Sequence, residues 1–260
     1  MPTDANTNAP TPPSEAPTPL RVIDLGLISY ADAYARQVDE VRRVLDSRAA
    51  STPGPHVGTL LLLEHPPVIT ISRRHGAASH LKASPELLAR HGVRLEETDR
   101  GGDITYHGPG QLVAYPILDL NRLRLRLHDY LRLLEEIVIE LCSACGIEAH
   151  RDPAATGVWI HPIHPGEPDA KICAMGVRIR QWVSMHGLAI NVTTNLNHFD
   201  LIVPCGLADR RVTSLSNILA EKSPSIERVK SMLAERFQLM VSARLALPDP
   251  ANQVPPLTQA

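Results

Sequence analysis

The chain has 260 residues, with 26 Lys and Arg against 28 Asp and Glu, which gives a formal net charge of −2 at pH 7. Hydrophobic residues make up 43% of the chain and charged residues 21%, as in ordinary globular proteins. These values exclude a collagen-like, coiled-coil or wholly disordered chain. The near-neutral charge and the 3% of aromatic residues argue against nucleic-acid binding, which needs a basic surface or stacking platforms.

The cysteine content and the apolar runs favour a cytoplasmic protein with reduced thiols and no membrane association. The first residues, Met1 to Asp4, show no basic or apolar stretch of a secretory signal. The longest uncharged apolar run, Gly58 to Leu63, is far shorter than the roughly 20 residues that span a bilayer. The chain has four cysteines, Cys142, Cys145, Cys173 and Cys205. Four cysteines in a chain of this length are too few for a scaffold held together by disulfides.

Both ends of the chain are rich in proline. Residues 1–19 hold six of the 23 prolines, and residues 248–260 repeat this composition. Such segments cannot bury enough apolar surface to offset the entropy lost on ordering. We therefore expect two flexible tails around one folded domain at residues 20–247.

The hydrophobic pattern predicts many strands and a few helices. Strands are expected at residues 22–25, 58–64, 68–72, 104–106, 112–118, 157–160, 172–179 and 183–192. Helices are expected after Ser29, where Asp32 completes a capping box, and at residues 130–145 and 226–237. Strands 58–64 and 68–72 are predicted to be joined by a turn, and 104–106 and 112–118 to form a hairpin-like pair. The pattern is typical of an α+β domain with a mixed, mainly antiparallel sheet flanked by helices.

Glycine-rich segments carry the candidate chemistry. The run Arg100–Gln111 combines four glycines with several polar side chains, which is typical of either a hairpin with glycine-rich ends or a ligand-binding loop. It is neither a Walker A loop nor a dinucleotide fingerprint, because no helix follows the glycines. Glycines also interrupt the strand patterns at Lys171–Arg178 and His186–Val192, where a bulge or a close ligand approach is expected.

Cys205 lies between a proline and a glycine in a predicted loop rather than on an apolar helix face. A thiol attacks as thiolate, and its ordinary pKa is about 8.5, so a nearby cation must lower that pKa. Lys171 or His107 can supply this effect if the fold brings either one close.

Four segments in this order resemble the lipoyl(octanoyl) transferase family: Arg100–Gln111, Lys171–Arg178, His186–Val192 and Pro204–Leu207. The resemblance spans about residues 22–240. It implies the fold of the biotin and lipoate protein ligases and octanoyl transfer from acyl carrier protein to a lysine of lipoyl domains. It further implies that Cys205 is the acyl-accepting nucleophile and that Lys171 lowers its pKa. No cofactor is implied.

The resemblance also implies an acyl-chain and substrate pocket. Its members are Arg100, Gly101, Gly102, Asp103, Ile104, Thr105, Tyr106, His107, Ala174, Met175, Gly176, Gly187, Leu188 and Ala189. We expect the glycines to keep an apolar tunnel open, because side chains at these positions would intrude on it. Residues 161–170 form a longer link than is usual in the family, which bears on the shape of the pocket rim.

The implied partners are octanoyl-acyl carrier protein, the lipoyl domains of 2-oxoacid dehydrogenase complexes and the H protein of glycine cleavage. A monomer is expected. Clusters of arginine offer candidate surfaces for steering an acidic carrier; they are Arg73–Arg74, Arg122 with Arg124 and Arg126, Arg178 with Arg180, and Arg210–Arg211. No dedicated metal site is expected, since His150, His161 and His164 would bind a metal only adventitiously.

Three alternatives remain open from the sequence. An ATP-dependent lipoate or biotin ligase of the same fold would need no cysteine nucleophile. An amidotransferase would move octanoyl between lipoyl proteins. A binding module without catalysis would keep its function when Cys205 is replaced by alanine.

Overall fold

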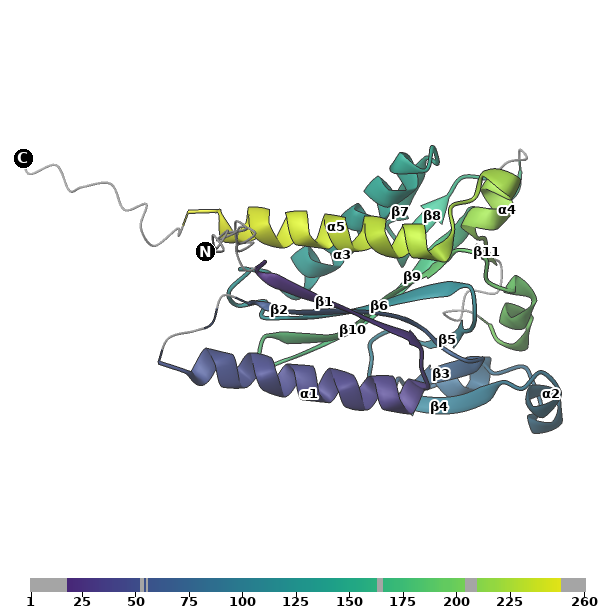
Figure 1. The fold of residues 1–260 in the computed structure, drawn as a ribbon. Coiled ribbons are helices and arrows are strands. Elements are labelled where there is room, and N and C mark those ends of the chain that lie inside the picture. Colours follow the sequence, from purple (N-terminus) through teal and green to yellow (C-terminus); the bar gives the residue numbers. More distant parts are fainter. Residues whose placement is uncertain (1–17, 52–53, 55, 163–165, 204–209, 249–260) are drawn as a thin grey trace, which may run out of the picture.

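The computed structural model describes residues 18–51, 54, 56–162, 166–203 and 210–248. A large mixed sheet forms its centre (Figure 1). In spatial order its strands are β1 (Leu20–Leu27), β2 (Gly58–Glu64), β6 (Gln111–Leu118), β10 (Val183–Asn191), β9 (Ala170–Arg180), β8 (Ala155–Ile160) and β7 (Ala149–Asp152), with β11 (Arg211–Val212) paired to β9. The β1–β2 and β9–β11 pairs are parallel and the others antiparallel, so the expected sheet type is confirmed.

Helices cover both faces of this sheet (Figure 1). The helix α1 (Tyr30–Ala49) packs on one face, and α3 (Leu127–Ala144) and α5 (Ile226–Leu245) pack on the other. The Ser29 side chain accepts a hydrogen bond from the Asp32 N–H and caps α1, as its capping box predicts. Apolar side chains on one stripe of α3 and α5 are fully buried against the sheet, which makes the larger of two core layers.

A second, three-stranded sheet lies at one end of the molecule (Figure 1). Its strands are β4 (Arg94–Thr98), β3 (Val68–Ser72) and β5 (Ile104–His107). Around it lie α2 (Pro85–Arg90) and short 3-10 helices at Ala77–His80 and Leu196–Leu201, whereas α4 (Leu215–Leu219) and the 3-10 helix Ala220–Lys222 that follows it lie near α5, with α4 packed on the core of the large sheet (Figure 1). The small sheet has its own apolar cluster, in which Tyr106 packs edge-on against Phe199.

Strands β2 and β3 are joined by the short turn at residues 65–67, as predicted, but the expected hairpin-like pair of β5 and β6 is wrong, because the chain changes sheets at each of these turns. β2 pairs with β1 and β6, which fill both of its edges, whereas β3 pairs with β4 and β5. β5 and β6 also lie in different sheets. The Gly110 N–H donates to the Glu64 carboxylate at 2.7 Å, and the Gly110 carbonyl accepts from the Val192 N–H at 3.1 Å. These long-range bonds hold the turn against the large sheet.

Within the described ranges, none of the helices combines the length and the apolar character needed to cross a membrane.

Core packing along α5 yields a matched stability prediction. Leu233 is fully buried, whereas Leu239, on the same helix, has 63% of its surface exposed. Leu233→Ala should lower the free energy of unfolding by about 2–5 kcal/mol through lost burial and the cavity left behind. Leu239→Ala should change it by no more than about 0.5 kcal/mol. Urea denaturation of both variants checks this, and equal effects would show that α5 does not pack as described.

Candidate active site

A pocket lies where the loop before β5 meets strands β9 and β10, and its empty space is about 480 Å³ when the open solvent at its mouth is included. Every expected pocket residue except Gly101 and Tyr106 lines it. The described residues that line it are Arg100, Gly102, Asp103, Ile104, Thr105, His107, Val113, Tyr115, Ala174, Met175, Gly176, His186, Gly187, Leu188 and Ala189. Three segments far apart in the sequence are therefore brought together as expected, whereas Val113, Tyr115 and His186 were missed.

The glycines allow backbones to approach each other around the cavity. The Gly101 N–H donates to the Val177 carbonyl at 3.0 Å. A Cβ atom at Gly176 would lie 2.6 Å from the Gly101 carbonyl oxygen, and one at Gly187 would lie 2.2 Å from that of Ala114. Real Cβ atoms do not tolerate such distances. The expectation that these two glycines keep an apolar tunnel open is therefore wrong, because a Cβ atom at either position would meet neighbouring backbone rather than enter the cavity.

Two side chains of the loop before β5 fix this loop at the rim of the cavity, one by binding to β3 and the other by pairing with the 3-10 helix Ala77–His80. The Arg100 guanidinium donates to the Thr70 carbonyl at 2.8 Å and to its hydroxyl at 2.9 Å. The Asp103 carboxylate accepts from the Ile104 N–H at 2.8 Å and pairs with His80 Nδ1 at 3.0 Å. These bonds leave little freedom to the polar groups at the cavity rim.

His107 is buried and held as a neutral imidazole. Its Nδ1 lies 2.7 Å from Gln111 Oε1, while the Gln111 amide nitrogen donates to Asn191 Oδ1 at 2.9 Å. The Gln111 oxygen therefore accepts, so Nδ1 carries the proton and Nε2 is left as an acceptor. Burial lowers the His107 pKa to about 3, and nearby His65, also buried, has its pKa lowered to about 4.

His186 is the most informative of the missed residues. It has a positive φ of 57° within β10, and its Nε2 lies 2.9 Å from Asp99 Oδ1. Although burial opposes it, hydrogen bonds from His186 and Tyr34 keep the pKa of Asp99 below its usual range. Burial lowers the pKa of His186, whose buried Nδ1 has no hydrogen-bond partner among the described residues. The sequence signal was a histidine inside an apolar strand, directly before Gly187.

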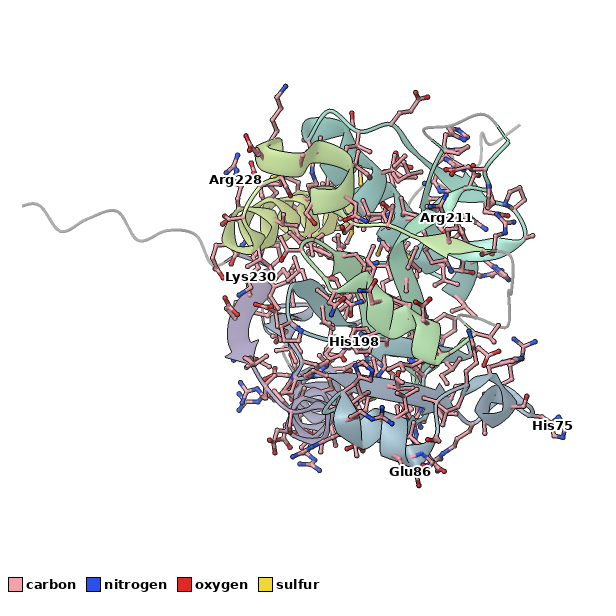
Figure 2. The ribbon with its side chains drawn as sticks, turned by 90° about the vertical axis from the view of Figure 1, so that its right-hand side faces the viewer. His75, Glu86, His198, Arg211, Arg228 and Lys230 are labelled. Atoms are coloured by element: carbon pink, nitrogen blue, oxygen red, sulfur yellow. The ribbon has the colours of Figure 1, made fainter. Side chains whose placement is uncertain are left out.

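The two expected residues that do not line the cavity support it from behind. Gly101 makes the backbone bond to Val177. The Tyr106 hydroxyl bonds to Nδ1 of His198, which Figure 2 labels on the 3-10 helix Leu196–Leu201, at 2.7 Å. Burial raises the pKa of Tyr106 to about 12, so this side chain stays a phenol.

Lys171 lies on β9 three residues before Ala174, about 10 Å along the strand at the usual rise per residue. Only 8% of its surface is exposed. Its Nζ donates to the Thr156 carbonyl at 3.1 Å and lies 4.6 Å from the centre of the Trp159 ring. The β8–β9 register shifts between Val158 and Trp159, and such bulges re-aim side chains. Lys171 is therefore held beside the cavity rather than in its wall.

Cys205 lies outside the described residues. On one side of segment 204–209, the Val203 N–H donates to the His80 carbonyl at 2.7 Å. On the other side, Arg210 pairs with Asp152 at 2.6 Å and lies 4.9 Å from the Trp159 ring. The described ends of this segment are therefore anchored beside the Asp103 rim and beside Lys171.

Burial makes the described cysteines poor nucleophiles. The pKa of Cys142 is raised to about 12, and that of Cys173 is also raised by burial. Burial raises the pKa of Cys145 as well. Since the thiolate is the reactive form, none of these three has the environment that a nucleophilic thiol needs.

Comparison with known proteins identifies the class. The model of the lipoyl protein ligase A/B catalytic domain matches residues 41–238, so the chain belongs to this family. A solved lipoate protein ligase from Thermoplasma acidophilum shares the fold, with a TM-score of 0.61 at 18% identity, over 85% of this chain and 83% of that chain. The expected lipoate-ligase type of fold is confirmed.

Within this class, the curated relatives are octanoyltransferases. The octanoyltransferase of Christiangramia forsetii is 42% identical over 231 residues, which cover 87% of this chain and 97% of that protein. The octanoyltransferase of Caldicellulosiruptor saccharolyticus is 46% identical over 205 residues, covering 78% and 81%. The prediction of an acyltransferase of the octanoyltransferase kind is therefore confirmed.

The lowered pKa values of His65 and His107 predict that the folded state loses stability in acid. The unfolded chain binds protons at histidine below about pH 6.5, whereas folded His65 and His107 stay neutral down to about pH 4 and 3. Stability should therefore fall as pH decreases from 7 to 5, by about 1.4 kcal/mol per pH unit for each histidine at the acid end. Urea denaturation at several pH values measures this slope.

Two variants isolate the contribution of His107 to this slope. His107→Gln should give a shallower dependence of the unfolding free energy on pH. His75→Gln, at an exposed position, should leave the slope unchanged. An unaltered slope in His107→Gln would mean that this imidazole is not held neutral.

Proposed function

We propose that the chain transfers octanoyl from octanoyl-acyl carrier protein to a lysine of lipoyl domains through a thioester on Cys205. The acceptors would be the lipoyl domains of 2-oxoacid dehydrogenase complexes and the H protein of glycine cleavage. The observation that carries the proposal is the juxtaposition of a largely apolar cavity with buried Lys171, beside the described ends of the segment that contains Cys205.

Lys171 would activate the nucleophile. An ammonium group next to a thiol favours the thiolate and lowers the thiol pKa. The Thr213 N–H donates to the Lys171 carbonyl at 3.0 Å, which ties the chain that follows Cys205 to the start of β9. Contacts with Thr156 and Trp159 restrict the lysine side chain, so its charge is held in one place.

The proposed reaction has two steps. The Cys205 thiolate attacks the thioester carbonyl carbon, the new C–S bond forms and the old C–S bond breaks, and the leaving carrier sulfur takes a proton from the Lys171 ammonium, which leaves Lys171 neutral. The acceptor amine then attacks this enzyme thioester, a C–N bond forms, and Cys205 leaves as thiolate. The amine proton passes to a base, for which Lys171 in its neutral form is our candidate. Because an amide replaces a thioester, the transfer is downhill and needs neither ATP nor a metal.

The acyl chain would occupy the cavity. Ile104, Leu188 and Ala189 supply apolar surface, and the neighbouring histidines are kept neutral by burial. Each methylene of the octanoyl chain that leaves water would contribute about 0.8 kcal/mol to binding. A cavity of fixed length would therefore select among acyl chains.

The thioester mechanism can be tested by intact mass and peptide mapping. Incubation with octanoyl-acyl carrier protein in the absence of ATP should place one octanoyl group on Cys205, and a lipoyl domain should discharge it. Cys205→Ala should show neither adduct nor transfer. Adduct formation only with ATP would favour the ligase alternative, and full transfer by Cys205→Ala would exclude the thioester.

Lys171→Ala should slow adduct formation at pH 7 by up to about 30-fold, because a thiol that returns to its ordinary pKa of about 8.5 is only about 3% thiolate at that pH. The rate should recover partly at pH 9, where solvent deprotonates the thiol. Single-turnover kinetics across this pH range measure the effect. A deficit that is equal at pH 7 and pH 9 would rule out pKa lowering as the role of Lys171.

Among the arginine clusters, Arg73–Arg74 fits carrier steering best. Arg178 pairs with Asp99, and Arg211 pairs with Glu167, so these cations are partly neutralised. Arg73 and Arg74 are exposed next to Ser72, whose hydroxyl donates to the Gly102 carbonyl at the cavity rim at 2.9 Å. Figure 2 shows the neighbouring His75 projecting from the body of the molecule.

Charge reversal by Arg73→Glu with Arg74→Glu should raise KM for octanoyl-acyl carrier protein about 10-fold at low salt, by repelling the acidic carrier. KM for a small octanoyl thioester should not change. Arg42→Glu, on an exposed site of α1, is the matched control and should behave as the unaltered protein. If KM for both donors rises together, this surface does not recognise the carrier.

A further inference from the structure

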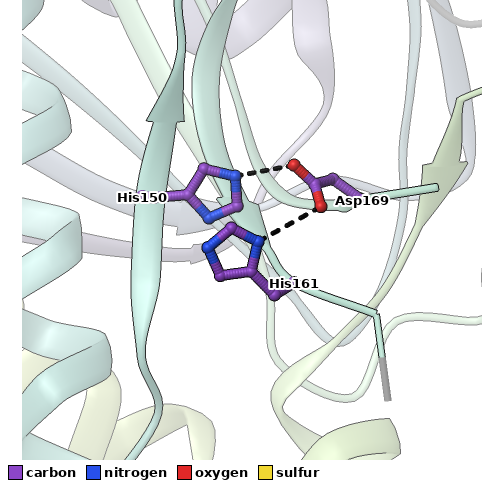
Figure 3. Close-up of side chains that lie close together, drawn as sticks. All are labelled: His150, His161 and Asp169. Atoms are coloured by element: carbon purple, nitrogen blue, oxygen red, sulfur yellow. Dashed lines mark hydrogen bonds and ion pairs between the residues drawn. The ribbon is translucent and has the colours of Figure 1, made fainter. Parts of the chain in front are cut away.

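We propose that His150, His161 and Asp169 form a site for a divalent transition-metal ion, with Zn²⁺ as the ion that its chemistry fits best. The three side chains come from different elements: β7, the residue after β8 and the residue before β9. Figure 3 shows both imidazole rings directed at the same carboxylate. The site is independent of the acyl-transfer proposal and departs from the expectation of no dedicated metal site.

The distances in this cluster are close to those of a metal site. His150 Nε2 lies 2.7 Å from Asp169 Oδ2, and His161 Nδ1 lies 3.3 Å from Asp169 Oδ1. One ligand atom from each residue can be chosen so that all three lie within 4.8 Å of one another. Tetrahedral zinc bonds of about 2.0–2.2 Å separate ligand atoms by about 3.3 Å. Small side-chain movements would therefore suffice to place an ion among the three atoms.

The donor set is suited to zinc rather than to magnesium or calcium. Two imidazole nitrogens and one carboxylate oxygen leave one coordination position for water, a common arrangement at zinc sites. Magnesium and calcium prefer shells made wholly of oxygen. The imidazole rings are stacked, 3.8 Å apart at their centroids with an angle of 10° between them, so the exposed His161 ring must rotate to bring the in-plane lone pairs of both nitrogens onto one ion.

The environment leaves the cluster both preorganised and accessible. His150 and Asp169 are about three-quarters buried, while His161 is 62% exposed and offers an approach from solvent. The β7–β8 and β8–β9 ladders hold the backbones, through the His150–Trp159 and Ile160–Ala170 pairs. Much of the ordering that a metal site requires is therefore already supplied by the sheet.

Such an ion would join the two ends of the long link at residues 161–170. His161 and Asp169 flank most of this link, and Asp169 lies two residues before Lys171. A bound ion would hold the start of β9, with a gain in stability that grows with the ratio of the free metal concentration to Kd. His164 lies outside the described residues and is not part of the proposed site.

Isothermal titration of the metal-stripped, tag-free chain with ZnCl₂ tests the proposal. All titrations use the Cys205→Ala protein as the background, because the Cys205 thiol can itself bind zinc. One equivalent of Zn²⁺ should bind and raise the melting temperature. Asp169→Asn and His161→Gln, which keep similar shapes, should each weaken binding at least 10-fold. His75→Gln, at an exposed histidine, should not weaken it.

Circular dichroism and melting without metal establish that each variant is folded. Mg²⁺ and Ca²⁺ should neither bind at micromolar concentration nor raise the melting temperature. Undiminished zinc binding in both Asp169→Asn and His161→Gln would overturn the proposal. So would an absence of zinc binding by the background protein, in which case the cluster is a hydrogen-bonded network only.

Discussion

The site depends on one close approach between two backbones. The Gly101 N–H reaches the Val177 carbonyl at 3.0 Å, and Gly176 lies so near the Gly101 carbonyl that no Cβ atom fits between them. This contact docks the loop of the small sheet on β9 of the large one. The cavity is the space that remains beside it, so its walls belong to two sheets with separate cores. Without the glycines, the sheets would be held further apart and the cavity would lose its shape.

The same docking removes water from several titratable groups. His107 and His186 enter the interface as neutral imidazoles, because burial penalises their charged forms. Bonds to Gln111 and Asp99 partly compensate this burial. The strained φ of His186 persists because its N–H is held by Gln37 of α1 at 2.7 Å. Burial thereby adds no charge to the cavity from these two side chains of its lining.

Much of the site could be predicted from the sequence, because it is built from short segments with unusual local composition. The run from Arg100 to His107 and the glycine-interrupted strands β9 and β10 carry their signal in adjacent residues. Val113 and Tyr115 carry none, since they are ordinary residues of an apolar strand until β6 is placed beside β10. The expected β5–β6 pairing failed for the same reason: the local turn pattern does not contain the distant partners, such as Glu64 and Val192, that hold the Gly110 turn.

Charge and apolar surface are separated along β9, and the proposed chemistry follows from this separation. Ala174 and Gly176 face the cavity, whereas Lys171 lies at the start of the strand against Trp159, with Arg210 on the same ring. Lys171 and Arg210 thus gather near the described ends of the Cys205 segment, whereas Arg100, a cation of the cavity lining, has its guanidinium bound to Thr70. Thiolate activation needs nearby positive charge, but alkyl binding is weakened by charged groups that must lose water. By placing about 10 Å of strand between Lys171 and Ala174, the fold keeps the charge proposed to activate the thiol apart from the wall of the cavity that β9 supplies.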